Sequence, residues 1–314
     1  MLTVNQQINK PKVAVVVLTY NHKDLLHDSL STYLDNDYPN YEVVVIDNGS
    51  SDGTFDFVKE SYPKASVIRT ENNLGYSGGL NFGLHHAFNE IHADYALVSN
   101  NDVKADKNVI NELIKVAQSD NKIGFVTGKV YYYDHPDILQ TVGKYEDPIR
   151  WNGDHIGCQE KDTGHYDTIS ERIFIDDIFM LVSQKLYKEI GGYDTNFRFQ
   201  SEEYDWQARA KKNGYIIMYT PFAKIWHKVS MTIGKQSAFK AYYDARNPML
   251  VQLLHRPASA FRKYFWYHSK NVLFISLKHI KNLQFHAAFK NTQGFLSGIW
   301  WGLKNKKFSL NHFM

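Results

Sequence analysis

Cysteine is almost absent from this sequence of 314 residues, which contains only Cys158. A single thiol excludes an internal disulfide framework and a cysteine-based zinc site, and it fits a reducing compartment. The first twelve residues are polar and lack the basic and apolar segments of a secretory leader. No apolar run reaches the roughly 18 residues of a membrane-spanning helix. We therefore expect a cytoplasmic chain without a transmembrane segment.

Acidic residues are absent from residues 245–314, which contain eleven Lys and Arg. Because the whole chain carries a net charge of +3, this basic segment leaves −8 for the first 244 residues. The basic segment is also rich in Trp, Phe and Tyr. We expect a catalytic domain over 1–244 and a basic, aromatic helical tail over 245–314. A nucleic-acid binder would explain the tail but not the acidic remainder, so no nucleic acid is expected.

The tail has the pattern of a helix that lies on a membrane surface. If residues 261–283 are helical, four lysines fall within an arc of about 80° and four apolar residues lie opposite. The lysines are Lys263, Lys270, Lys278 and Lys281, and the apolar residues are Phe261, Phe265, Val272 and Leu283. Further along, Trp300 and Trp301 lie near three more lysines. This pattern predicts peripheral attachment at the inner face of the cell membrane; a helical lid and a homo-oligomer interface are the alternatives.

Two motifs of other enzyme classes are also missing. No Gly-x-Gly-x-x-Gly follows the first apolar run, which disfavours a dinucleotide-binding domain. The P-loop motif is absent.

Apolar periodicity predicts alternating strands and helices. Strands are expected over residues 13–20, 41–48, 65–70 and from 95, with helices over 21–34, 54–61, 80–91 and 108–119. Asn21 is expected to cap the first helix. Further strands are expected over 124–133, 173–183, 215–219 and 223–227, with helices over 184–190 and 202–212. The polar segment 134–167 is expected to be a mobile excursion near the site.

This alternation indicates an α/β fold. Four strand–helix repeats in about 100 residues are typical of a mostly parallel central sheet with flanking helices. A composition of 43% hydrophobic and 15% aromatic residues excludes a disordered chain. We expect residues 12–102 to form a nucleotide-binding half and residues 103–244 an acceptor half, followed by a C-terminal helical extension.

The apolar strand from Tyr95 ends in Asn100, Asn101 and Asp102. In an open α/β sheet, ligands bind beyond the carboxyl ends of the strands. A carboxylate with two carboxamides suits a divalent cation, which takes oxygen ligands and shares them with phosphates. An ordinary Asn/Asp turn is the structural alternative.

Eight motifs, in this order, resemble those of family 2 glycosyltransferases over residues 12–245. They are Leu18-Thr-Tyr-Asn21, Ile46-Asp-Asn-Gly-Ser-Ser-Asp-Gly-Thr54, Asn73-Leu-Gly-Tyr-Ser-Gly-Gly79 with Asn81, Ser99-Asn-Asn-Asp102, Gly191-Gly-Tyr-Asp194, Glu202-Glu-Tyr-Asp205 with Arg209, Gly214-Tyr215 and Trp226-His227. The resemblance is greatest to rhamnosyltransferase-like enzymes of bacterial cell-surface polysaccharides. It implies a GT-A fold, a UDP- or dTDP-sugar donor, a divalent metal (Mg²⁺ or Mn²⁺), inversion at the anomeric carbon and a glycan or lipid-linked acceptor.

The resemblance also implies roles for individual residues. Asp102 and His227 would hold the metal, and Glu203 would be the general base. Donor-binding positions are Thr19, Tyr20, Asn21, Asp47, Asn48, Asn73, Gly75, Gly78, Asn81, Asn100, Asn101 and Asp102. Gly79 would, like Gly75 and Gly78, let the backbone approach the donor. Acceptor-binding candidates, and competitors for the role of base, are Asp176, Asp177, Glu202 and Asp205.

Two departures from the family pattern concern the chemistry. The metal motif has one carboxylate, Asp102, where the family pattern has two, so metal binding should rely more on the donor's phosphates. Glu203 replaces the commoner Asp as base. A glutamate with an ordinary pKa of about 4.3 is ionised at neutral pH, so no tuning of its pKa is expected. The alternative to an enzyme is a non-catalytic module of the same fold that binds a nucleotide sugar or a glycan.

Overall fold

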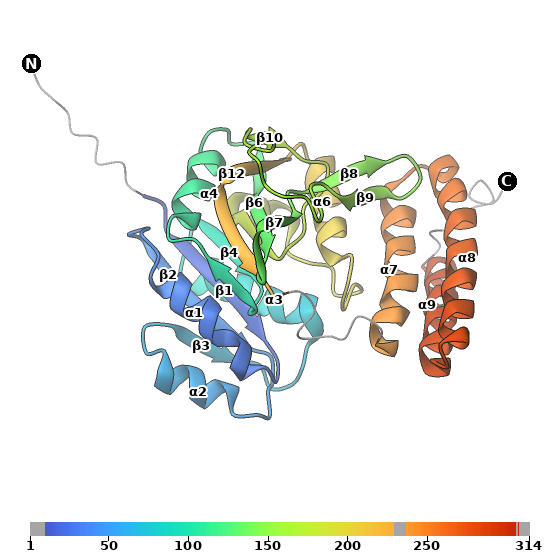
Figure 1. Ribbon diagram of the computed structural model, residues 1–314, viewed down its shortest axis with the longest axis horizontal. Coiled ribbons are helices and arrows are strands. Elements are labelled where there is room, and N and C mark those ends of the chain that lie inside the picture. Colours follow the sequence, from blue (N-terminus) through green and yellow to red (C-terminus); the bar gives the residue numbers. More distant parts are fainter. Residues whose placement is uncertain (1–9, 229–236, 306, 308–314) are drawn as a thin grey trace, which may run out of the picture.

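The computed structural model describes residues 10–228, 237–305 and 307 (Figure 1). A large sheet with helices on both faces forms one part of the molecule, and three C-terminal helices lie at one side of it. Within the described residues, no helix has both the length and the apolar character that crossing a bilayer requires.

The first half of the sheet is parallel, in the order β3-β2-β1-β4. These strands are β1 (Val13–Thr19), β2 (Tyr41–Asp47), β3 (Ser66–Arg69) and β4 (Tyr95–Ser99). Successive side chains of a strand point to opposite faces, and both faces of β1 are buried. A run of β-branched residues suits a strand that is buried on both faces. The parallel strands expected within residues 12–102 are thus present, and nucleotide binding by this half stays a prediction.

The second half of the sheet is mixed. It contains β6 (Ile123–Tyr132), β11 (Phe179–Ser183), β12 (Ile216–His227) and the short edge strand β10 (Ser170–Glu171). The strand β11 runs antiparallel to both β4 and β6, whereas β12 runs parallel to β6. Two strands lie off this path: β5 (Val103–Ala105) pairs with β12, and β7 (His135–Thr141) pairs with β6.

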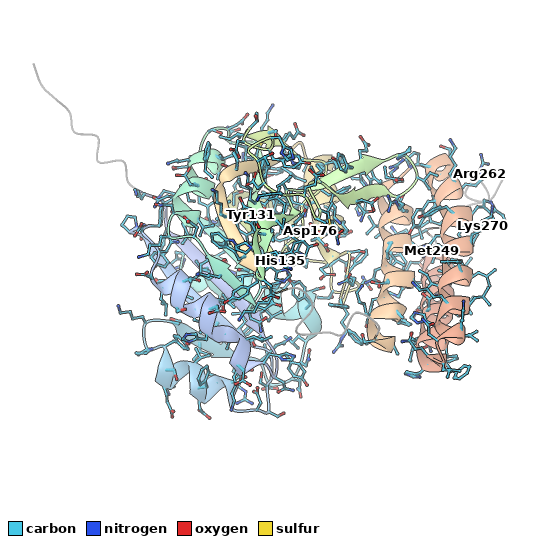
Figure 2. The ribbon with its side chains drawn as sticks, in the orientation of Figure 1. Tyr131, His135, Asp176, Met249, Arg262 and Lys270 are labelled. Atoms are coloured by element: carbon cyan, nitrogen blue, oxygen red, sulfur yellow. The ribbon has the colours of Figure 1, made fainter. Side chains whose placement is uncertain are left out.

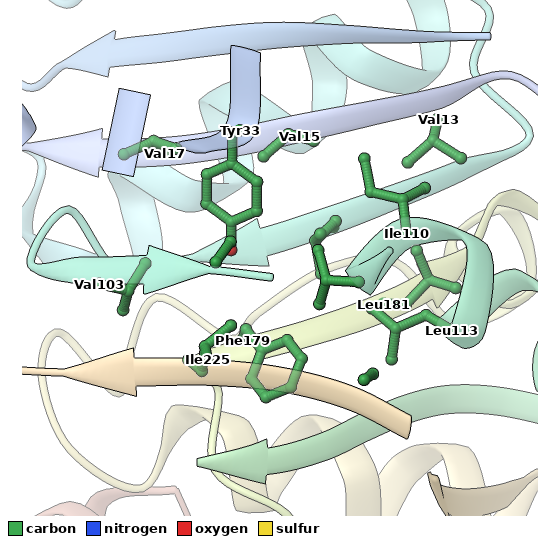
Figure 3. Close-up of a cluster of buried hydrophobic side chains, with 14 of the residues drawn as sticks. Val13, Val15, Val17, Tyr33, Val103, Ile110, Leu113, Phe179, Leu181 and Ile225 are labelled. Carbon is green, nitrogen blue, oxygen red and sulfur yellow. The ribbon is translucent and has the colours of Figure 1, made fainter. Parts of the chain in front are cut away.

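Helices cover both faces of the sheet. They are η1 (Lys23–Leu25), α1 (Leu26–Leu34), α2 (Thr54–Ser61), α3 (Gly75–His85), the π-helical η2 (His86–Glu90), α4 (Val109–Ala117), α5 (Gln184–Ile190) and α6 (Glu202–Lys212). On one face, Tyr33 of α1 and Ile110 of α4 belong to the cluster that contains Val15 and Val17 (Figure 3). On the other, Leu80 of α3 and Trp206 of α6 belong to the cluster that contains Val16. The site therefore stands on a doubly covered sheet.

Four expectations about local structure need correction. Asn21 is not a helix cap: it has a φ of 54°, and its side chain accepts a hydrogen bond from the Ser51 amide. The helix expected from residue 80 begins at Gly75. Only residues 179–183 of the predicted strand 173–183 are a strand. The two strands expected over 215–219 and 223–227 are one strand, β12, with a register shift between Tyr219 and Lys224.

The segment 134–167 is also more regular than predicted. It forms β7 and the hairpin of β8 (Lys144–Asp147) and β9 (Trp151–His155). The buried ammonium group of Lys129 lies 2.5 Å from Asp162 and 2.6 Å from Asp167, so it ties the end of this segment to β6. A charge buried this deeply requires such partners. The sequence pattern alone could not reveal them.

The C-terminal helices are α7 (Ala238–His255), α8 (Ala258–Lys281) and α9 (Phe285–Lys304). The helix α9 approaches α7 closely, since a Cβ on Gly294 would lie 2.1 Å from the Tyr242 carbonyl oxygen. The Asn247 amide donates to the Phe199 and Gln200 carbonyls, which fastens α7 to the α/β part. The expected domain boundary at residues 244/245 therefore lies inside α7.

Candidate functional site

A cavity of about 710 Å³ opens at the carboxyl ends of β1 and β4. It is lined by Leu18, Thr19, Tyr20, Asn21, His22, Asn48, Asn73, Gly75, Tyr76, Asn100, Asn101, Asp102, Arg198, Phe199, Gln200, His227, Phe239 and Lys240. These residues come from both halves of the sheet and from α7. Ten of the residues that the sequence nominated for the donor or the metal are among them, so the cavity is the candidate donor site.

Asp102 and His227 meet in this cavity. The Asp102 Oδ1 lies 3.2 Å from the His227 Nε2, and both side chains are buried. His227 is the last residue of β12 and pairs with Val103 of β5. The backbone amide of Lys228 also donates to the Asp102 carbonyl. The sheet thus brings together two residues that are far apart in the sequence.

The donor atoms of this pair fit a divalent cation. The His227 Nδ1 lies 2.9 Å from the Gln140 Oε1, and a proton on Nδ1 that is donated to this oxygen leaves a lone pair on Nε2. That lone pair and the Asp102 carboxylate would repel each other unless a cation or a proton lies between them. Two ligands about 2.1 Å from an octahedral ion lie about 3 Å apart, which agrees with their separation. Gln140 fixes the ring of His227 in the manner of an outer-sphere partner.

Several donor-site residues also hold the cavity wall in shape. The Asn101 amide donates to the Thr19 hydroxyl at 3.1 Å, which joins β1 to the end of β4. The Asn48 amide donates to the Gly75 carbonyl at 3.0 Å, and the Asn48 Oδ1 accepts from the Leu74 amide at 3.1 Å. Gly75 has a φ of +77°, and a Cβ there would lie 2.5 Å from Arg198. Glycine therefore suits this position for both conformation and space.

Three nominated donor residues do not line the cavity. Asp47 is fully buried; its Oδ1 accepts from the Ser50 amide at 2.8 Å, and its Oδ2 lies 3.4 Å from the Arg69 Nε. The side chain of Asn81 bonds the backbone of Tyr193 in both directions. Gly78 lies within α3, where a Cβ would meet Leu74. Donor contact by these three stays a prediction, and their visible role is to support the wall.

Gly79 likewise faces the sheet. A Cβ on this residue would lie 2.6 Å from Leu18 and 3.0 Å from the Asn48 amide. Its small size therefore lets α3 pack on β1 and β2.

A group of carboxylates lies beside the cavity, and Tyr76 connects this group to the cavity. The Tyr76 hydroxyl donates to the Asn100 Oδ1 at 3.2 Å in the cavity and also hydrogen-bonds to Asp177. Asp177, Glu202 and Glu203 have carboxylate oxygens within 4.8 Å of one another. The sequence nominated all three. Their clustering, between the segment just before β11 and the first turn of α6, appears only in the fold.

Burial raises the pKa of these three carboxyl groups. It raises the pKa of Glu203 well above its ordinary value, and the negative charges of Asp177 and Asp176 add to the effect. For Glu202, burial acts first and the charges of Glu203 and Asp177 second. Burial, aided by Asp176, raises the pKa of Asp177 to about 7. The expectation that Glu203 keeps an ordinary pKa is therefore wrong.

The cluster can accept a proton or bind a cation. The Glu202 Oε2 is buried and has no hydrogen-bond partner among the described residues. Three carboxylates this close cannot all be ionised without a compensating positive charge. The cluster can thus hold a shared proton, and by its donor atoms it is a second place where a cation would fit.

Asp176 and Asp205 have other partners. Asp176 lies 2.9 Å from the Tyr204 hydroxyl and 3.5 Å from the Lys144 ammonium. Burial alone would raise the pKa of Asp176, but Lys144, His155 and Tyr204 outweigh it and lower that pKa. Asp205 is bound by Arg209 at 2.9 Å and by His255 at 2.7 Å. Arg209 lies on α6 itself, whereas the contact of Asp205 with His255 connects α6 to α7.

A family model described as Glycosyl transferase family 2 matches residues 14–190, which is more than half of the chain. The chain belongs to glycosyl transferase family 2. This confirms the resemblance inferred from the eight motifs.

Curated relatives include synthases of a polysaccharide. The chain is 27% identical over 227 residues to the poly-beta-1,6-N-acetyl-D-glucosamine synthase of Staphylococcus aureus (strain MSSA476), an alignment that covers 71% of this chain and 51% of the relative. It is 26% identical over 224 residues to the same synthase of Staphylococcus epidermidis, with the same coverage. The chain thus spans about half the length of the curated relatives it matches.

Two solved structures share the fold. One is a mannosyltransferase from Pyrobaculum calidifontis in complex with GDP-Man and Mn²⁺, with a TM-score of 0.56 and 13% identity over 93% of this chain and 88% of that one. The other is GalNAc-T7 with UDP, GalNAc and Mn²⁺, with a TM-score of 0.58 and 14% identity over 83% of this chain and 55% of that one. The fold is therefore the expected GT-A fold.

Several cavity residues escaped the sequence reasoning. Tyr76 belongs to a family motif but was not given a role. Arg198 comes from the loop before α6, and Phe239 and Lys240 come from the first turn of α7. The available signal for Arg198 was its place in the sequence between two family motifs, Gly191-Gly-Tyr-Asp194 and Glu202-Glu-Tyr-Asp205. No local signal marked Lys240, which reaches the cavity only because α7 docks on the α/β part.

We expect Asp102→Asn to weaken Mn²⁺ binding by more than the roughly 10- to 100-fold that loss of an outer-sphere partner costs. The amide keeps the size of the side chain and removes the charge beside His227. Electron paramagnetic resonance of free Mn²⁺ measures this in the absence of donor. Glu203→Gln and Asp177→Asn are the controls and should bind Mn²⁺ normally. If these two lose binding while Asp102→Asn retains it, the carboxylate cluster is the metal site.

Proposed function

We propose that this chain is an inverting, metal-dependent glycosyltransferase that moves a sugar from a UDP- or dTDP-sugar to a glycan or lipid-linked acceptor in bacterial cell-surface polysaccharide synthesis. The observation that carries the proposal is that a pair of residues suited to bind a cation lies close to a cluster of buried carboxylates. Asp102 and His227 line the same cavity as Tyr76, whose hydroxyl hydrogen-bonds to the carboxylate cluster. A donor and an acceptor can therefore meet between them.

The donor half is suited to a nucleoside diphosphate. Asp102 and His227 would hold a divalent cation, which when bound would neutralise charge on the leaving diphosphate. Arg198 and Lys240 also line the cavity, and Lys240 is paired with Asp244 at 2.6 Å. Arg198 would compensate for the single carboxylate of the metal motif, because it would give the phosphates a partner besides the metal. The nucleoside would then lie toward Thr19, Tyr20 and Asn21.

Glu203 is suited to act as the general base. In our proposal, the acceptor hydroxyl oxygen forms a bond to the anomeric carbon from the face opposite the diphosphate. The bond from the anomeric carbon to the diphosphate oxygen breaks, and the diphosphate leaves with the electron pair. The hydroxyl proton passes to the Glu203 carboxylate, so mass and charge balance. A base with a raised pKa is a stronger proton acceptor than an ordinary carboxylate.

The positions around Glu203 support this assignment over its competitors. Asp205 is engaged by Arg209 and His255, and Asp176 by Lys144 and Tyr204. Glu202 is more deeply buried than Glu203, at 3% against 9% exposure. Asp177 accepts a hydrogen bond from the Tyr193 hydroxyl at 3.1 Å and shares another with Tyr76, which suits a positioning role.

A screen of donors tests the proposed function. We expect transfer or slow hydrolysis with at least one nucleotide sugar when Mn²⁺ is present, and none after chelation. The panel begins with UDP-N-acetylhexosamines, which are suggested by the polysaccharide synthases among the relatives, and includes dTDP-rhamnose. Mass spectrometry measures the released nucleoside diphosphate. Tight binding of a nucleotide sugar without turnover, across donors and acceptors, would favour the non-catalytic binding module instead.

Glu203→Gln should lower kcat by about 10²- to 10⁴-fold, the usual effect of removing a general base. The amide preserves size but accepts no proton, so the KM for the donor should change little. Steady-state kinetics with the best donor of the panel measure both constants. Glu202→Gln and Asp177→Asn are the matched comparisons. If Glu202→Gln is the inactive variant and Glu203→Gln turns over normally, the base is Glu202.

The raised pKa values predict a pH profile. A base must be ionised to act, so kcat/KM should rise as the pH increases through the raised pKa and level off above it, at a pH well above that expected for an ordinary glutamate. An ordinary glutamate, with a pKa of about 4.3, would give this rise in kcat/KM near that pH. The measurement uses saturating Mn²⁺, so that loss of metal at low pH does not imitate titration of the base. Full activity at pH 5 would contradict the prediction.

A further inference from the structure

The outer surface of the C-terminal helices is unusually apolar. Among the residues that the structure describes, twelve large apolar side chains are more than half exposed, and ten of them lie between Trp266 and Leu303. Large contiguous apolar patches on a protein surface mark interaction sites. The rest of the described surface, by contrast, has only Tyr145 and Phe222 exposed to this degree.

On α8, apolar and basic side chains share one exposed face. At about 100° per residue, Trp266, Leu273, Leu277 and Ile280 fall within about 60° of one another. The next 100° or so of the same face carries Lys263, Lys270, Lys281, Phe274 and Lys278. All of these side chains are exposed. Figure 2 shows Lys270 at the side of α8 that is turned away from the α/β part.

This differs from the arrangement that the sequence predicted. The face opposite the lysines was expected to meet the membrane, but Phe261 and Val272 are buried, and Phe261 packs with Met249 of α7. That face is the internal contact of the helical unit. Leu283, just past the end of α8, is exposed, and the other available apolar side chains are those interleaved with the lysines.

The helix α9 presents a second apolar strip. One face carries the small residues that pack on α7, among them Gly294 and Gly298. The exposed face carries Phe285, Phe289, Leu296, Trp300 and Leu303. At about 100° per residue these five fall within about 60° of one another. A cavity of about 490 Å³ lies against Phe289, Leu296 and Trp300.

The charge of this surface decides between possible occupants. Residues 245–314 contain no Asp or Glu. In a symmetric dimer the same patch meets itself, so lysines would face lysines without a carboxylate to pair with. An anionic lipid surface instead supplies both an apolar phase and negative charge. Lysine stems can lie along apolar surface while their ammonium groups reach the phosphates.

We propose that the exposed faces of α8 and α9 dock on the surface of an anionic lipid bilayer. Trp266 and Trp300 would lie at the level of the headgroups, where tryptophan is enriched. Phe274, Phe289 and Leu296 would enter the acyl boundary, as in other interfacial helices. Lys263, Lys270, Lys278 and Lys281 would contact lipid phosphates. This docking does not depend on the proposed enzymatic activity.

Vesicle co-sedimentation of the full chain tests the proposal. The protein should bind phosphatidylcholine vesicles that contain phosphatidylglycerol, bind pure phosphatidylcholine weakly, and release in high salt. Each lysine near an anionic surface changes partitioning about fivefold. Changing Lys263, Lys270, Lys278 and Lys281 together to Gln should therefore lower it on the order of 100-fold or more. The matched control changes Lys59, Lys64, Lys122 and Lys188 to Gln, four exposed lysines of the α/β part, and should bind normally.

A second set of variants tests the apolar contact. Changing Trp266, Phe274, Phe289 and Trp300 together to Ser should abolish sedimentation, whereas Phe222→Ser, an equally exposed change on β12, should not. Quenching of tryptophan fluorescence by brominated lipid gives an independent readout. It should occur in the wild type and fall in a Trp266→Phe, Trp300→Phe variant, which keeps both apolar side chains.

Two outcomes would overturn the proposal. Vesicle binding that is unchanged in the lysine-to-Gln and apolar-to-Ser variants would mean that another surface binds lipid. Absence of vesicle binding, together with a dimer in light scattering that the apolar-to-Ser variant dissociates, would assign the patch to a second copy of the chain. Nucleotide-sugar hydrolysis without vesicles should be the same in wild type and variants, which separates this test from that of the enzyme.

Discussion

The pairing of β12 with two strands at once is the constraint on which the site depends. The strand runs parallel to β6, and its last three residues pair antiparallel with β5. A slip of one residue would turn His227 to the other face of the sheet and separate it from Asp102. Close approach of β12 to β6 also needs Gly128, where a Cβ would lie 2.1 Å from the Ala223 carbonyl oxygen. The geometry of the metal pair is thus a consequence of strand register.

The carboxylate cluster lowers the stability of the fold. Three carboxyl groups are withdrawn from water beside the cavity, and burial disfavours their ionised forms. Such an arrangement persists only where the surrounding fold enforces it, and it is typical of functional sites. Lys144 provides partial compensation, because it lies 3.5 Å from Asp176 and its charge lowers the pKa of Glu203. Tyr76 connects this strained region to the donor cavity.

The C-terminal helices show where a periodicity argument succeeds and where it fails. The sequence indicated helices with basic and apolar faces, and α8 and α9 are present. Which apolar face is exposed was not predictable from the sequence, because this depends on which face packs on α7 or α9. The helix α7 has two roles in consequence. Its first turn lines the donor cavity with Phe239 and Lys240, and its later residues form the core of the helical unit with Met249.

The sequence by itself determined the four parallel strands, the family and the identity of most candidate residues. These follow from local information: β-branched runs such as that of β1 are buried on both faces, and motifs such as Asn100-Asn101-Asp102 lie next to the strands that position them. Only the tertiary structure decided which of these residues meet. The contact of His227 with Asp102, the clustering of Asp177 with Glu202 and Glu203, and the entry of Lys240 into the cavity all join distant segments. Burial, which raises the pKa of Glu203, is likewise a property of the assembled fold, because desolvation depends on everything packed around a group.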